Sequence, residues 1–155
     1  MSWFTELRNH PAPTLPASVV RPLEIVVPYC EPALTGAVLK KAAQMAAGLD
    51  AHVSLIAVHT LPYPLPFVCP TLVHAYLVEQ LMELASHAGL PVNPQVVLAR
   101  DRTEAFRFAI PKGSTVLVGT RKRLWRTAEE KLARRLALDG HHVAVVPITG
   151  DTCSI

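Results

Sequence analysis

Residues 114–148 read STVLVGTRKRLWRTAEEKLARRLALDGHHVAVVPI, and the order of patterns within them indicates the architecture of the whole chain. An apolar strand stops at Gly119, a helix starts near Thr127, and a second apolar strand follows Gly140. Strand, helix and strand in this order predict two parallel strands, with the loop 120–126 at the carboxyl end of the sheet. Ligands of open α/β sheets bind at that edge.

The same alternation of apolar strands and amphipathic helices runs through the rest of the chain. Thr127 and Glu130 have the spacing of a capping box at the start of the last helix, and Gly89 and Gly140 can end helices. We predict strands at 23–29, 52–59, 94–99, 115–119 and 142–148, and helices at 31–49, 73–88, 103–110 and from 127 onward. This pattern predicts an α/β fold with an open five-stranded parallel sheet and helices on both faces.

Composition indicates one domain. We place it at 22–149, between a proline-rich amino-terminal arm (1–21) and a short tail (150–155). The 155 residues are 50% hydrophobic, yet no apolar run approaches the roughly 20 residues of a membrane-spanning helix. The amino terminus lacks the apolar core of a signal peptide, so we expect a cytoplasmic protein without a membrane partner. A net charge of +3 does not favour nucleic-acid binding.

The loop after the fourth strand is a candidate anion site. Its basic run RKRLWR could hold an anion through side-chain donors in place of the backbone amides of a glycine-rich loop. The alternative, which we favour, is a solvated loop in which Trp125 packs against the following helix. The candidate ligands are Gly119, Thr120, Arg121, Lys122 and Arg123.

A second candidate site lies where the first two strands end. Cys30 is a candidate redox-sensitive thiol, and His59 ends the second strand at the same edge, where it could meet Tyr29 or Cys30 across a crevice. A cysteine beside a histidine can be nucleophilic, but no third orienting residue or oxyanion motif is visible. The alternative is that Cys30 fills a core position. We therefore expect no enzymatic activity, and we find no set of residues that predicts a metal site.

Two other loops allow both a structural and a functional interpretation. Asp101 follows the third strand and is best placed to cap the next helix. The loop from Leu61 to Pro70 holds Tyr63 and Phe67 among prolines, so it is either a lid or partner surface or a plain connector.

Three features resemble the universal stress protein family: Gly119-Thr120-Arg121 at the end of strand four, Arg100-Asp101 after strand three, and VAVVP in strand five. The resemblance covers residues 23–148. It implies an adenine-nucleotide α-hydrolase-like fold, a Rossmann-like three-layer sandwich with strand order 3-2-1-4-5. It also implies a homodimer through the last strand, an apolar edge that would otherwise expose unpaired backbone groups. The candidate interface residues are Val143, Val145 and Ile148.

Many members of that family bind ATP through an acidic residue at the end of strand one and a glycine motif after strand four. In this chain Tyr29 replaces the acidic residue, and Gly119 matches only the first glycine. The other motif positions hold Lys122, Leu132 and Ala133 when counted forward, or Glu129 and Glu130 when counted back from strand five. Bulky or acidic side chains there would crowd or repel a phosphate at the helix amino terminus.

We therefore expect a regulatory or interaction domain in stress response that has no cofactor and does not bind ATP in the usual family mode. The alternative is a domain that binds ATP, AMP or a small anion through the basic loop after strand four.

Overall fold

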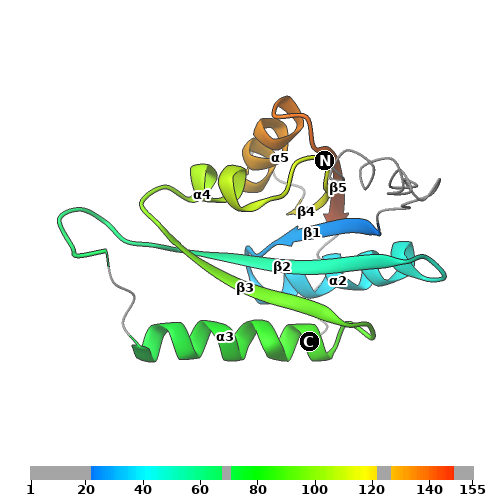
Figure 1. Ribbon diagram of the computed structural model, residues 1–155, viewed down its shortest axis with the longest axis horizontal. Coiled ribbons are helices and arrows are strands. Elements are labelled where there is room, and N and C mark those ends of the chain that lie inside the picture. The colour runs from blue at the N-terminus through cyan, green and yellow to red at the C-terminus, as the bar shows by residue number, and fades with distance from the viewer. Residues whose placement is uncertain (1–21, 68–70, 122–126, 149–155) are drawn as a thin grey trace, which may run out of the picture.

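The computed structural model describes residues 22–67, 71–121 and 127–148, which form one sheet flanked by helices (Figure 1). Strands and helices alternate along the chain, and every strand pair is parallel. The strand order is β3-β2-β1-β4-β5, which confirms the predicted fold class. The elements are β1 (Leu23–Pro28), α2 (Pro32–Ala46), β2 (Ala51–Thr60), α3 (Thr71–Ser86), β3 (Val92–Ala99), α4 (Arg102–Ala109), β4 (Thr115–Arg121), α5 (Ala128–Leu138) and β5 (His142–Ile148).

Some element ends differ from the prediction. The helix predicted to reach residue 49 ends at Ala46, because Gly48 takes a φ of +75°, which an α-helix does not contain. Strand β3 starts at Val92 and tolerates Pro94, because it lies at the edge of the sheet. Strand β4 continues past Gly119 to Arg121, since its last residues still pair with β5.

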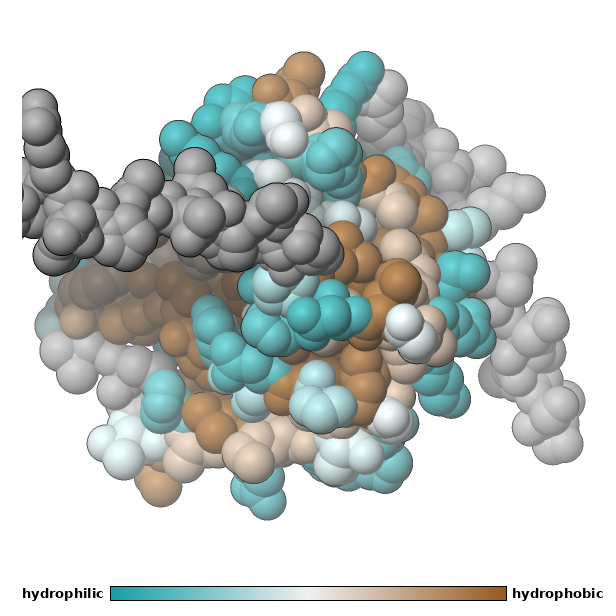
Figure 2. All heavy atoms as spheres, turned by 45° about the vertical axis from the view of Figure 1, so that its right-hand side comes forward, coloured by the Kyte–Doolittle hydropathy of each residue, from teal (hydrophilic) through white to brown (hydrophobic). Residues whose placement is uncertain are grey.

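Two hydrophobic cores lie on opposite faces of the sheet, which confirms the three-layer arrangement. Helices α2 and α3 cover one face, where Leu39 and Leu81 are buried against Ile25. Helices α4 and α5 cover the other face, where Phe106 and Leu136 are buried. Figure 2 shows that polar and apolar groups are interspersed on the outer surface of one side of the molecule, as is usual for folded proteins.

The helix ends confirm the predicted caps. Thr127 Oγ1 accepts a hydrogen bond from the Glu130 amide at 3.2 Å, and Asp101 Oδ1 accepts one from the Glu104 amide at 2.8 Å. Gly140 has a φ of +92°, which lets the chain turn from α5 into β5. These caps fix where α4 and α5 begin, beside the carboxyl ends of the strands.

Candidate functional site

The candidate site lies where strands β1 and β4 end side by side. The chain leaves β1 towards β2 on one side of the sheet and leaves β4 towards β5 on the other, so this point is the topological switch of the sheet. Open α/β sheets bind ligands outside the strand ends at such a switch. Tyr29, Cys30 and Glu31 follow β1, and Thr120 and Arg121 end β4.

An ion pair bridges this switch point. The guanidinium of Arg121 contacts the carboxylate of Glu31, which occupies the N-cap position of α2. Both side chains remain partly exposed, so the pair adds little to stability, on the order of 1 kcal/mol or less. Its main consequence concerns ligands: the positive charge of Arg121 is already neutralised by a carboxylate of the protein.

A second arginine joins the site from α4. Arg102 Nη2 donates to the carbonyl oxygen of Tyr29 at 3.3 Å and lies 4.0 Å from Glu129 Oε1. Its guanidinium also lies 5.0 Å from the centre of the Phe106 ring. Arg102 was not among the site residues predicted from the sequence. The only available signal was a basic residue at the first position of a helix that follows a strand at this edge.

The thiol and the phenol of the site are held in their neutral forms. The Cys30 amide donates to Thr35 Oγ1 at 3.2 Å, and Cys30 Sγ lies 3.5 Å from the same oxygen. Burial raises the pKa of the Cys30 thiol above its ordinary value, and burial also raises the pKa of Tyr29. At neutral pH Cys30 is therefore a thiol and not a thiolate, and it is a poor nucleophile.

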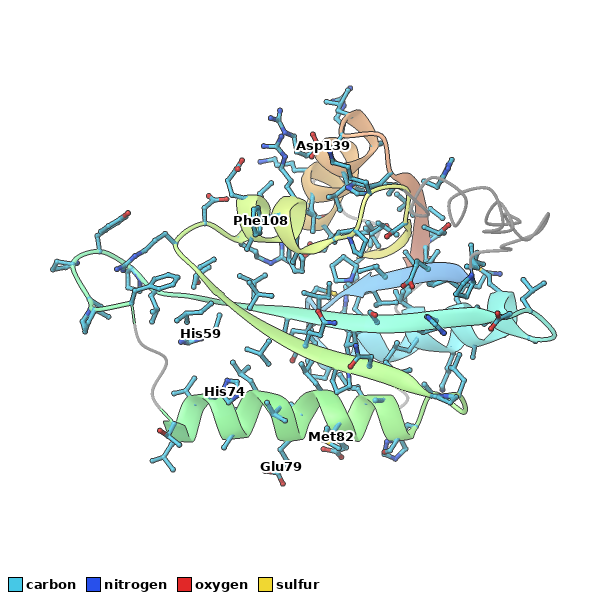
Figure 3. All side chains as sticks on the ribbon, in the orientation of Figure 1. His59, His74, Glu79, Met82, Phe108 and Asp139 are labelled. Carbon is cyan, nitrogen blue, oxygen red and sulfur yellow. The ribbon has the colours of Figure 1, made fainter. Side chains whose placement is uncertain are left out.

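His59 does not complete a pair with Cys30. The β1–β2 register ends with Pro28 opposite Ile56, and the bridge partner of His59 is Leu98 of β3. Figure 3 shows His59 beyond the end of β1, on the side of the sheet that faces α3 and His74. No hydrogen bond or ion pair between described residues joins His59 to Tyr29 or Cys30. Strand β2 extends beyond the end of β1, so His59 lies further along the sheet than the residues that follow β1.

Gly119 and Thr120 lie inside the end of β4. A Cβ atom on Gly119 would stand 2.6 Å from Val38 Cγ2 and 2.9 Å from Leu34 Cγ, so glycine here lets α2 pack closely on the strand. Thr120 is buried. Lys122 and Arg123 lie outside the described residues. Of the predicted ligands, the structure brings together Tyr29, Cys30 and Arg121.

The predicted dimer residues lie on the edge strand β5. Val145 is exposed, and Val143 and Ile148 are half-buried. A groove of about 290 Å³ runs between α5 and β5 and is lined by Val143, Val145 and Ala137 among others. An apolar edge with a groove beside it is a surface on which a second chain could pair.

The described residues contain neither a metal-binding cluster nor a membrane-spanning helix. No group of three or more His, Cys, Asp or Glu side chains in the described ranges is arranged to hold a metal ion. Among the helices that the structure describes, none has the length and apolarity needed to cross a bilayer.

Fold and site together define an open α/β protein whose switch point holds arginine–carboxylate pairs. Solved structures with this fold are universal stress proteins. One from Archaeoglobus fulgidus has a TM-score of 0.56 at 19% identity, over 81% of this chain and 93% of that one. A second structure is of the universal stress protein from Archaeoglobus fulgidus in complex with dAMP. It has a TM-score of 0.56 at 20% identity, over 81% of this chain and 97% of that one. One from Burkholderia pseudomallei has a TM-score of 0.54 at 22% identity, over 81% and 96%.

The chain therefore has the universal stress protein fold, as the sequence resemblance implied. No protein-family model matches it, and no curated protein matches it significantly by sequence. The structural similarity establishes the shared fold, and at identities near 20% the function has to be argued from the site itself.

Proposed function

We propose that this protein is a non-enzymatic regulatory or interaction module of the universal stress protein type, acting in stress response without binding ATP in the usual family mode. One observation carries the proposal: the Glu31–Arg121 ion pair spans the switch point. A phosphate placed there would have to displace Glu31 from Arg121 and then lie beside a free carboxylate. Glu129, in the first turn of α5, adds a second negative charge at the same edge.

The state of the other side chains supports a role other than catalysis. Burial keeps the Cys30 thiol protonated, and Tyr29 stands where ATP-binding relatives carry an acidic residue. Arg102 is engaged with the Tyr29 carbonyl and Glu129. The thiol of the site is therefore not activated, and its two carboxylates, Glu31 and Glu129, are paired with arginines.

The alternative is that the site holds a nucleotide such as ATP or AMP, or a small anion, with Arg121 as ligand. Two observations favour it: the arginines Arg102 and Arg121 both reach this edge, and a protein of the same fold has been solved with dAMP. In this case the anion would replace the Glu31 carboxylate as the ionic partner of Arg121. Lys122 and Arg123, outside the described residues, would be further ligands.

Titration with ATP and AMP distinguishes the two. We expect no saturable binding to the wild-type protein at micromolar concentrations, measured by calorimetry. Glu31→Gln frees Arg121, so we expect anion affinity to rise about tenfold, equivalent to about 1.4 kcal/mol. Glu24→Gln is the matched control, because it removes the same charge from the opposite end of the sheet and should change nothing. Micromolar binding to the wild type that Arg121→Glu abolishes would establish the alternative instead.

We also propose that the module is a homodimer through β5. Val145→Asp places a carboxylate on the apolar edge, opposite its own copy across a two-fold axis, and should convert dimer to monomer in sedimentation velocity. Met82→Asp is the control, since Met82 is also exposed but lies on α3, which packs against the opposite edge strand β3. A wild-type protein that sediments as a monomer at every concentration would refute this interface.

A further inference from the structure

Exposed apolar side chains gather at one end of the molecule. Five of the ten large apolar side chains that are exposed in the described residues lie in the loop after β2 and in the first turns of α3. Figure 1 shows this loop and the start of α3 at the same end of the molecule, on the left. We call these five the apolar tip: Tyr63 (80% exposed), Leu65 (51%), Phe67 (54%), Leu72 (85%) and Tyr76 (61%). Such a concentration usually marks an interaction site.

Part of the backbone of the tip loop is hydrogen-bonded within the protein. Arg100 Nη1 donates to the carbonyl oxygens of Leu61 and Pro62, both at 3.1 Å, and Nη2 donates to that of Leu65 at 2.8 Å. The amides of Leu61 and Leu65 also bond within the protein. Residues 62, 64 and 66 are prolines and have no N–H to satisfy. These internal bonds and the prolines lower the cost, in lost hydrogen bonds to water, of placing the loop in an apolar medium.

Arg100 also holds the two aromatic rings of the loop. Its guanidinium carbon lies 4.4 Å from the centre of the Tyr63 ring and 5.3 Å from that of Phe67. The positive charge is thus shared among three carbonyl oxygens and two ring faces, which lowers the cost of removing it from water. The contacts with Arg100 hold the loop and its two rings in place.

The chain segment that carries the tip has no formal charge of its own, and the charged group that touches it is Arg100. The sequence contains no Asp, Glu, Lys or Arg from residue 51 to residue 78. A protein–protein interface has a polar rim and about one hydrogen bond per 100 to 200 Å². Three carbonyl oxygens of the tip loop are instead bonded within the protein, and three of its residues are prolines without an N–H. Exposed Tyr, Phe and Leu side chains on a segment without charges of its own, beside one arginine bound to its carbonyl oxygens and rings, match the boundary between lipid headgroups and acyl chains.

We propose that the apolar tip docks on a lipid bilayer surface. Leu65, Phe67 and Leu72 enter the acyl boundary, and the tyrosines lie at headgroup depth. The protein rests on the membrane by this end without spanning it. This proposal differs from the expectation of no membrane partner, which rested on the lack of a spanning apolar run and a signal core, because the tip residues come to the same end of the molecule only in the folded chain. The inference is independent of what the switch-point site binds.

Vesicle co-sedimentation tests the proposal. The full chain is mixed with vesicles of phosphatidylcholine, alone or with phosphatidylglycerol. We expect binding to both compositions that persists in about 0.5 M salt, because apolar burial drives it and charge does not. Leu65→Asp and Leu72→Asp should each lower the partition coefficient at least about tenfold. Phe108→Asp is the matched control: Phe108 is 95% exposed on α4, outside the tip, and its replacement should leave binding unchanged.

Three results would overturn the proposal. The first is a wild-type protein that stays in the supernatant with both vesicle types, which would point to a protein partner for the tip. The second is binding that needs phosphatidylglycerol and disappears in high salt, which would indicate attraction by basic residues. The third is a Phe108→Asp variant that loses as much binding as the two tip variants. Circular dichroism verifies that each variant is folded, and the two tip substitutions serve as independent checks because both positions are exposed.

Discussion

Replacing Phe106 with alanine should lower the free energy of unfolding by about 3 to 5 kcal/mol, the range for a large aromatic side chain removed from a core. Phe106 has no exposed surface and packs in the core between the sheet and helices α4 and α5. Its ring also lies under Arg102, so the variant removes a support of the switch-point site. Denaturation by urea, followed by circular dichroism, measures the loss.

Phe108 provides the control for this substitution on the same helix. It is 95% exposed, so Phe108→Ala should change the free energy of unfolding by no more than about 0.5 kcal/mol. If Phe106→Ala leaves too little folded protein to measure, Phe106→Leu keeps most of the volume and should cost less than about 1.5 kcal/mol. Equal losses at positions 106 and 108 would contradict the assignment of the core face of α4.

Replacing Gly119 with alanine should also destabilise the protein, by about 1 to 3 kcal/mol, because the new methyl group has no room. The added Cβ would stand 2.6 Å from Val38 Cγ2 and 2.9 Å from Leu34 Cγ. The Leu34 atom is a branch point and not a flexible chain end, so relief needs a new χ1 rotamer of Leu34 or a shift of α2 away from β4. Thermal or urea unfolding of the purified variant measures this effect.

A double-mutant cycle can distinguish overpacking from other effects. Val38→Ala removes the methyl group that lies nearest to the added Cβ. We expect Gly119→Ala to cost less in the Val38→Ala background than in the wild type, since contacting residues couple. Strictly additive losses would show that Gly119 is needed for a reason other than the close approach of α2.

Fold prediction from this sequence succeeded where local patterns were strong. The core of β1, the start of α5 at Thr127 and the whole of β5 were predicted because apolar runs and capping residues mark them locally. The errors lie at ends that depend on neighbours. Strand β4 extends to Arg121 because β5 is there to pair with it, and β3 accepts Pro94 because no strand pairs beyond it in the described sheet.

The candidate site was predicted only in part. Tyr29, Cys30 and Arg121 were correctly placed at one edge, because the carboxyl ends of parallel strands share an edge. The sequence did not reveal that Glu31 pairs with Arg121 or that Arg102 reaches the Tyr29 carbonyl. The partners in these contacts come from different elements, and no spacing along the chain encodes them.

By itself, the sequence determined the α/β class and the alternation of elements, because hydrophobic periodicity and capping act over a few residues. It also determined that the glycines of a phosphate loop are missing. Only the tertiary structure decided which charges meet at the switch point and that Gly119 makes room for α2. The same holds for the apolar tip, where β2 and α3 bring scattered side chains to one end of the molecule. Contacts between distant segments depend on the packing of the whole sheet, which no local pattern records.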